Sequence, residues 1–186
     1  LPILMLDGFP LLPAQLPAWV SHAGTLFWFL AVVNAFNLVD GLDGLMGSVA
    51  LICALAFATM AWSWNLTDAV FILAILIGAL VGFLRWNLPR AATFAGDGGS
   101  LMGGYLLAAA SLRVASVDGG ANPEAPLRAL LALFLILSIP FYDVASVVWL
   151  RVVERRRLFE GDNSHLAHRL VRRGISPRRV LAFISM

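Results

Sequence analysis

NAFNLVDGLDGLMG, residues 34–47, decides how this chain folds, because its polar groups directly follow an apolar run. Its amides are Asn34 and Asn37, and its acids are Asp40 and Asp43. A carboxylate at bilayer depth is costly unless it lies at an interface, pairs with another group or binds a cation. Residues three apart on a helix are neighbours, so Asn37, Asp40 and Asp43 are expected in one row. We predict a site at the membrane surface that binds a cation and a polar substrate.

The alternative for this stretch is a helix end in water that is capped by aspartates. Capping needs one acid, whereas this stretch has two, with amides upstream. Gly41 and Gly44 follow the acids and remove side-chain bulk, so that a ligand or another backbone could approach closely. An EF-hand calcium loop is excluded because its alternating acidic ligands are absent.

The composition is that of an integral membrane protein. Of the 186 residues, 60% are hydrophobic and 13% are charged, and the mean hydropathy is +0.86. An ordinary soluble domain is about half apolar and about a quarter charged. All basic residues are arginine and the net charge is only +2. We therefore expect membrane lipid around the chain and no nucleic-acid partner.

The apolar runs predict an all-α, polytopic membrane helix bundle with about five spanning helices. Their expected positions are from Ser21 or Thr25 to about Asn37, and then residues 47–64, 69–84, 101–117 and 128–150. Turns rich in Gly, Pro, Asn or Asp separate them. The last run is long enough, at about 20 residues, to cross a bilayer as one helix. Residues 1–17 are interrupted by prolines and are interpreted as an interfacial loop or hairpin.

Alternation of these spans predicts the topology. The turn after Asn37, the loop of residues 85–100 and the tail from Arg151 then fall on one side of the membrane. All the arginines except Arg113 and Arg128 lie on that side. Because cytoplasmic loops carry an excess of Lys and Arg, this side is expected to be the cytoplasm.

A second polar stretch, FAGDGGSLMGG at residues 94–104, places Asp97 among glycines, with Ser100 expected to cap a helix that begins at Leu101. Glycine-rich turns before a helix expose backbone N–H groups that suit phosphate oxygens. An aspartate there would repel phosphate unless a divalent cation lies between them. Mg²⁺ is commonly held by one or two carboxylates and substrate phosphates. A simple capped turn is the alternative.

The third stretch is the tail, GDNSHLAHRLVRR at residues 161–173. Asp162 or Ser164 is expected to cap an amphipathic helix that lies on the cytoplasmic membrane surface. One face of this helix would carry His165, His168, Arg169 and Arg172. Such a face suits a diphosphate. Zinc binding by the two histidines is an alternative with no third ligand assigned.

Asp143 is a further acid, inside the last apolar run and shortly after Pro140. It could line the same site or pair with an arginine, and the sequence does not separate these two interpretations.

Together, NAFNLVDGLDGLMG, FAGDGGSLMGG, IPFYD and DNSHLAHRL resemble the motifs of the polyprenyl-phosphate N-acetylhexosamine-1-phosphate transferases, glycosyltransferase family 4. The last two motifs are similar to the undecaprenyl-phosphate GlcNAc-1-phosphate transferase branch. The resemblance implies transfer of a sugar-1-phosphate, with GlcNAc-1-phosphate expected, from a UDP-N-acetylhexosamine to undecaprenyl phosphate, with release of UMP. It also implies Mg²⁺ as cofactor, with Mn²⁺ as an alternative. The implied place is the cytoplasmic face of the inner (plasma) membrane, in cell-envelope polysaccharide biosynthesis; a homodimer is left open.

The resemblance also implies roles for individual residues. Asp97 resembles the family's magnesium ligand, Asp43 the acid near the uracil, and Phe94 the aromatic that packs on it. The expected catalytic residues are Asp40, Asp43, His165 and His168. The expected substrate-binding residues are Asn37, Phe94, Arg169 and Arg172, and the expected metal ligand is Asp97.

The chain departs from the family pattern in two places. Ala167 stands where this branch has another histidine, and the family's adjacent-aspartate motif, which precedes the DGLDG segment, is missing. We therefore expect residues 1–186 to be one membrane domain, the C-terminal part of a longer transferase, with residues 151–179 as a basic cytoplasmic loop. The competing hypotheses are a membrane transporter or channel with an acidic cation site, and a non-catalytic membrane scaffold. A transporter would place its acids near the bilayer midplane.

Overall fold

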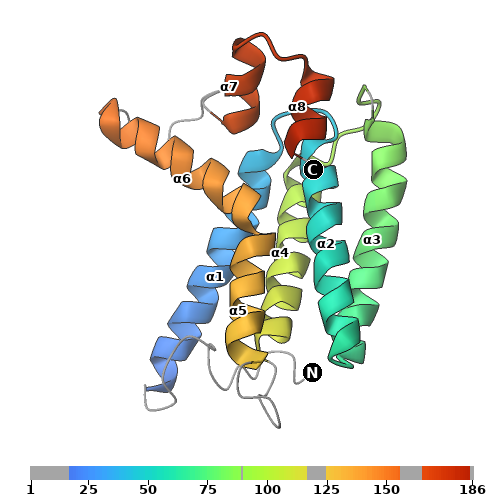
Figure 1. The fold of residues 1–186 in the computed structure, drawn as a ribbon, viewed down its shortest axis with the longest axis vertical. Helices are drawn as coiled ribbons and strands as arrows, with labels where there is room; N and C mark the ends of the chain where they lie inside the picture. Colours follow the sequence, from blue (N-terminus) through green and yellow to red (C-terminus); the bar gives the residue numbers. More distant parts are fainter. Residues whose placement is uncertain (1–16, 89, 117–124, 156–164, 185–186) are drawn as a thin grey trace.

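A computed structural model of the chain describes residues 17–88, 90–116, 125–155 and 165–184. Every regular element in these ranges is an α-helix, so the predicted all-α class is confirmed. The helices are α1 (Ala18–Val39), α2 (Leu45–Ser63), α3 (Thr67–Asn87), α4 (Gly96–Ala115), α5 (Ala125–Ile136), α6 (Ser138–Val153), α7 (Leu166–Arg172) and α8 (Pro177–Ile184). Helices α1 to α5 form a bundle, and α7 and α8 lie above one end of it (Figure 1). The hairpin expected in residues 1–17 falls almost wholly outside the described residues.

Three of the helices are long and apolar enough to cross a membrane. Their candidate spans are His22–Val39, Leu45–Ser63 and Thr67–Asn87. Helix α4 follows the bundle too, but its glycines, Asp97 and Arg113 make it more polar. The described residues thus hold three candidate spans, or four if α5 and α6 count as one, rather than about five.

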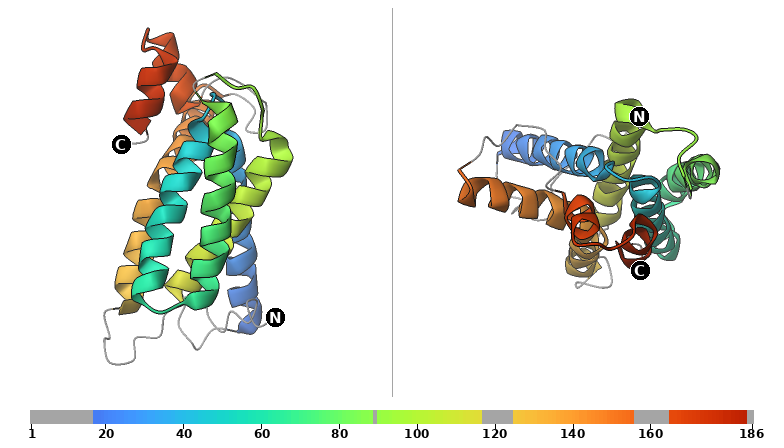
Figure 2. Two further views of the ribbon diagram at one scale, coloured as in Figure 1. Left: turned by 90° about the vertical axis from the view of Figure 1, so that its right-hand side faces the viewer. Right: turned by 90° about the horizontal axis from the view of Figure 1, so that it is seen from above.

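The residues 128–150, expected to cross the membrane as one helix, instead form two helices, α5 and α6, that meet at a bend of 61°; the pair still qualifies as one bent span. Pro140 lies in the first turn of α6 and has no N–H to donate to the carbonyl of Ile136. Its ring also crowds that carbonyl, which is a common cause of a sharp helix bend. As a result α6 turns away from the bundle axis (Figures 1 and 2), while it stays in contact with α1.

The core is built where α1 crosses α4. A Cβ at Gly104 would lie 2.9 Å from the Cα of Val33, so the two backbones approach closely only because position 104 has no side chain. Further along the crossing, Trp28 Nε1 donates to Ser111 Oγ at 3.0 Å, and both residues are buried. The crossing brings the C-terminal end of α1 to the N-terminal end of α4.

The outer surface of the bundle is apolar. Large hydrophobic side chains such as Phe27, Phe71 and Leu135 are mostly exposed. Backbone hydrogen bonds inside the helices satisfy the polar groups that lipid cannot. A surface of this kind, on helices of this length, is that of a membrane protein.

The polar motifs gather at the end of the bundle drawn uppermost in Figure 1. We call this the site end; it comprises the turn of residues 40–44, the loop of residues 90–95, the start of α4, and α7. The opposite end carries an ion pair between Arg113 Nε and Asp68 Oδ2 at 2.8 Å. The sequence therefore predicted correctly that the acidic and histidine motifs share one end.

Candidate functional site

The turn between α1 and α2 presents the two acids of the first motif. Helix α1 ends at Val39, Asp40 is its C-cap, and Asp43 lies in the turn. The predicted helical row of Asn37, Asp40 and Asp43 is therefore wrong, because the helix does not continue past Val39. Both acids are exposed at the site end, so their carboxylates are available to a ligand.

Asn87 holds this turn in place from the end of α3. Its Oδ1 accepts from the N–H of Gly44 at 2.6 Å, and its Nδ2 donates to the carbonyl of Thr93 at 2.6 Å. The side chain is buried, so a buried amide with both ends bonded connects the acidic turn to the loop before α4. Sequence analysis missed Asn87; its only signal is an amide at the end of an apolar helix, close to Pro89.

Asp43 makes a second connection to the same loop. Its Oδ2 accepts from the backbone N–H of Ala91 at 3.1 Å. Phe94, further along this loop, is 76% exposed. Because nothing in the described chain covers its ring, Phe94 is free to stack on a ligand that lies over the turn.

Asn37 is joined to the start of α4 by Ser100. The Oγ of Ser100 donates to Asn37 Oδ1 at 2.7 Å, and Ser100 is fully buried. The predicted capping role of Ser100 is wrong: α4 begins at Gly96, and the hydroxyl lies inside the helix. Gly96 has a φ of 58°, which lets the chain enter the helix earlier than the sequence suggested.

Asp97 lies in the first turn of α4 and is exposed. The pKa of Asp40 is raised above its ordinary value, first by partial burial and then by the negative charge of Asp97. The two carboxylates are therefore near enough to repel each other, although they come from different helices. A cation between them would relieve this repulsion.

The carboxylates of Asp40 and Asp97 fit a magnesium ion that takes its other oxygens from phosphate and water. Within the described ranges, no three His, Cys, Asp or Glu side chains gather as a metal-binding group. Zinc prefers three or four protein ligands, so the described part of the site does not suit zinc.

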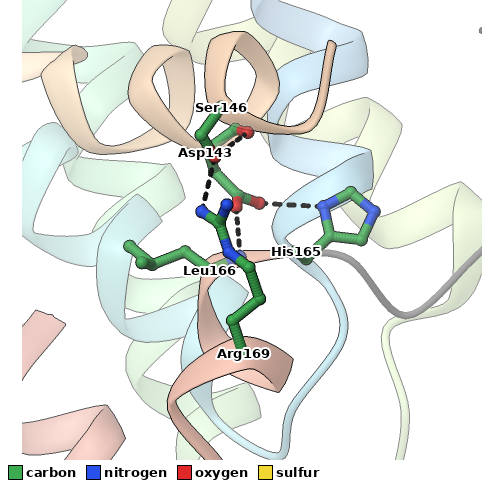
Figure 3. Close-up of polar contacts among 5 residues, drawn as sticks. All are labelled: Asp143, Ser146, His165, Leu166 and Arg169. Atoms are coloured by element: carbon green, nitrogen blue, oxygen red, sulfur yellow. Dashed lines mark hydrogen bonds and ion pairs between the residues drawn. The ribbon is translucent and has the colours of Figure 1, made fainter. Parts of the chain in front are cut away.

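The histidine motif is fixed to α6 by Asp143. His165 is the N-cap residue of α7, and its Nδ1 lies 3.0 Å from Asp143 Oδ2 (Figure 3). The other oxygen, Oδ1, accepts from the N–H of Leu166 at 2.6 Å. Of the two interpretations of Asp143, pairing with an arginine is not what these contacts show. The expected caps Asp162 and Ser164 lie outside the described residues.

Arg169 also contacts α6, through Nη2, which donates to Ser146 Oγ at 2.7 Å. His168 reaches the acidic turn instead: a Cβ at Gly41 would lie 2.9 Å from His168 Nε2. The predicted common helix face is shorter than expected, because α7 begins after His165. Arg172 is exposed at the last residue of α7. The basic loop predicted over residues 151–179 contains the end of α6, all of α7 and the start of α8.

Two contacts and one charge interaction therefore bring the predicted site residues together. Ser100 joins Asn37 to α4, the charges of Asp40 and Asp97 interact, and His168 lies against Gly41. The chemical roles assigned to these residues stay predictions. The arrangement combines carboxylates, imidazoles and guanidinium groups around an exposed turn, which suits a metal-bound diphosphate.

Comparison with known proteins finds matches over most of the chain. The model of the family described as glycosyl transferase family 4 matches residues 3–115. The chain is 37% identical over 173 residues to the decaprenyl-phosphate N-acetylglucosaminephosphotransferase of Mycobacterium leprae, covering 86% of this chain and 44% of that protein.

Two further relatives carry similar names. The chain is 31% identical over 160 residues to the probable undecaprenyl-phosphate N-acetylglucosaminyl 1-phosphate transferase of Bacillus subtilis, covering 86% of this chain and 43% of that protein. It is 29% identical over 166 residues to the undecaprenyl-phosphate alpha-N-acetylglucosaminyl 1-phosphate transferase of Escherichia coli K12. This match covers 87% of this chain and 44% of that protein. The chain thus spans less than half the length of each of these relatives.

Proposed function

Because this chain belongs to glycosyl transferase family 4, we propose that it transfers a sugar-1-phosphate from a UDP-sugar to a polyprenyl phosphate. The printed names of its relatives specify a polyprenyl phosphate and N-acetylglucosamine 1-phosphate. We accordingly propose GlcNAc-1-phosphate as the transferred group, UMP as the second product, and cell-envelope polysaccharide synthesis as the setting. A homodimer stays a prediction.

One observation carries this proposal. Motifs separated by more than a hundred residues meet at the site end, where His168 of α7 lies against Gly41 of the acidic turn. Asp97 of α4 approaches Asp40 in the same turn closely enough to raise its pKa. A transferase of this kind must hold a diphosphate between cationic side chains and a metal, and a histidine and two carboxylates around one turn support the proposal that this is such a site.

The proposed reaction is an in-line displacement at phosphorus. An oxygen of the polyprenyl phosphate forms a bond to the phosphorus that bears the sugar. The bond from that phosphorus to the bridging oxygen of the diphosphate breaks, and UMP leaves with the bridging oxygen. The attacking phosphate is already an anion, so the protein mainly positions the reactants and reduces their repulsion.

The residues of the chain divide this task. Asp40 and Asp97 would hold the magnesium ion, which would supply positive charge to neutralise the diphosphate. Recognition of the uracil ring is assigned to Asp43 and Phe94, and a further substrate-binding role to Asn37. His168, Arg169 and Arg172 provide donors to the phosphate oxygens, and His165 donates to them through Nε2 as the cationic ring.

The distribution of arginine supports a cytoplasmic site in the inner membrane. Arg113 and Arg128 lie at the end opposite the site, near the end of α4 and the start of α5. The other described arginines lie on segments at the site end or on α6 to α8. By the positive-inside rule, this end faces the cytoplasm. The acids Asp40, Asp43 and Asp97 also lie at the end of the bundle, which favours a transferase over a transporter with a midplane cation site.

The test is replacement of Asp97 by Asn in the whole natural protein, with UDP-GlcNAc, Mg²⁺ and polyprenyl phosphate in membranes. We expect UMP release to fall by about 100-fold or more, as loss of one preorganised charge at a transition state commonly causes. Asp68→Asn is the matched control, because Asp68 also occupies the first turn of its helix but lies at the opposite end. Retention of most activity by Asp97→Asn would remove Asp97 from the mechanism, and no transfer by the wild type would overturn the proposed function.

A further inference from the structure

We propose that Asp143 is a positioning residue for His165, which fixes the orientation and the tautomer of the imidazole so that Nε2 is presented to the substrate phosphates. This inference rests on the proposed function, because it assigns a purpose to the position of His165 in the same site. Asp143 touches no reacting group in this scheme and acts only through the histidine.

Both carboxylate oxygens of Asp143 have a hydrogen-bonding partner, although the residue lies on an apolar helix. The side chains of Asp143 and His165 are 6% and 12% exposed. Each carboxylate oxygen has its own partner, since Oδ2 lies 3.0 Å from His165 Nδ1 and Oδ1 accepts from the Leu166 N–H at 2.6 Å. Figure 3 shows the second ring nitrogen pointing away from Asp143.

Charge determines which nitrogen carries the proton. A buried carboxylate is costly unless it is hydrogen-bonded or paired. An ionised carboxylate has only acceptor sites, so Nδ1 must be the donor in this contact. In the neutral ring, Nε2 then carries the lone pair; in the cationic ring, it carries a second N–H. Asp143 thereby decides what Nε2 offers to a ligand.

The surroundings leave the ring little freedom to turn. Next to Asp143 and His165 is a cavity of only about 10 Å³, bounded also by Gly41 and Ala167. This volume is about the smallest that holds one water molecule. Asp143 lies just after the bend between α5 and α6, and from there it contacts both His165 and Leu166.

A purely structural role, capping of α7 through Leu166, is the alternative, and Asp143→Asn separates the two. Asparagine is as good an N-cap acceptor as aspartate, so the contact with Leu166 can persist. Its amide nitrogen would then face His165 Nδ1 as a donor, which favours the tautomer with the proton on Nε2. Capping alone predicts unchanged kinetics. Positioning predicts a lower kcat, because asparagine cannot pair with a cationic ring, and a neutral Nε2–H donates less strongly to phosphate than a charged one.

The kinetic test uses the whole natural protein in membranes with UDP-GlcNAc and polyprenyl phosphate. We expect Asp143→Asn to lower kcat by at least about tenfold, in the range that loss of an orienting partner causes, with KM for UDP-GlcNAc nearly unchanged. Tyr142→Phe is the matched control: Tyr142 is adjacent and exposed, and its substitution removes one polar atom from the same turn. An unchanged kcat in Asp143→Asn would overturn the inference and leave the proposed function standing.

A double-mutant cycle provides the readout that a structural role would not move. In a His165→Gln background, Asp143→Asn should cost little further activity, because its effect passes through the missing imidazole. If the loss of activity in the double variant instead equalled the product of the two single losses, the inference would be overturned.

A spectroscopic measurement keeps the inference testable if the enzyme assay fails. The ¹⁵N spectrum of labelled histidine distinguishes a proton on Nδ1 from one on Nε2, and His165→Gln identifies the signal. We expect the His165 proton on Nδ1 in the wild type and, for the neutral ring, on Nε2 in Asp143→Asn. The same tautomer in both proteins would overturn the inference even if the wild type transfers no sugar phosphate.

Discussion

Gly44 adopts a φ of 76° in the turn that presents Asp40 and Asp43. A Cβ at this position would overlap the side chain of Leu88. We expect Gly44→Ala to lower the free energy of unfolding by about 2–5 kcal/mol, because left-handed backbone costs about 1–2 kcal/mol and overpacking about 1–3 kcal/mol. The measurement is unfolding of the purified protein in detergent.

Substitutions at two other glycines separate the cost of the left-handed backbone from the cost of the contact with Leu88. Gly96 has a φ of 58° but open space around its Cβ position, so Gly96→Ala should lose only the backbone share. Gly78 lies inside α3 with neither constraint, and Gly78→Ala should be neutral or stabilising by up to about 1 kcal/mol. If Gly44→Ala were no less stable than Gly96→Ala, the contact with Leu88 would not constrain the turn.

Among the elements, the bend between α5 and α6 has the clearest single cause. We expect Pro140→Ala to restore the N–H that can donate to Ile136 and to straighten the pair. Spin labels at Leu131 and Val148, which are both exposed, would then move apart. Cys53 is buried, so labelling is directed to the introduced cysteines.

Ser138→Ala is the control for this distance, because it changes the same turn without adding a backbone donor. Identical label distances in Pro140→Ala and the control would mean that packing of α6 against α1, and not the proline, maintains the bend.

The same helices show which features a sequence reveals. The runs at residues 47–64 and 69–84 predicted α2 and α3 to within a few residues, because hydropathy changes sharply at both ends. The break at Leu137 was missed, because the residues on both sides of it are apolar and the proline acts through geometry. Ser100 was misread as a cap, since its partner Asn37 is 63 residues away. Asn87 was missed for the same reason, as its contact with Gly44 spans 43 residues.

For the whole molecule, the sequence predicted that the motifs share one end of the bundle but not how they meet. Alternating spans are enough to place Asp40, Asp97 and His165 on one side of a membrane. The particular contacts depend on two features that alternation does not contain: the close crossing of α1 and α4 at Gly104, and the bend between α5 and α6, just after which Asp143 contacts α7. The site is therefore a consequence of helix packing as much as of its own residues.

If the site end binds a metal-bound diphosphate as one unit, binding should stabilise the whole fold. A ligand at about ten times its Kd adds about 1.4 kcal/mol to the free energy of unfolding. Each kcal/mol raises Tm by about 2–4 °C in a protein of about 150–250 residues, and by less in a longer one. We expect UDP-GlcNAc with Mg²⁺ to raise the Tm of the whole natural protein by a few degrees. The increase should disappear with EDTA or in Asp97→Asn and persist in Asp68→Asn, because Asp68 lies at the opposite end of the bundle. A shift that survives both EDTA and Asp97→Asn would show that the nucleotide binds without the carboxylate pair, and no shift at millimolar ligand would favour a transporter or scaffold.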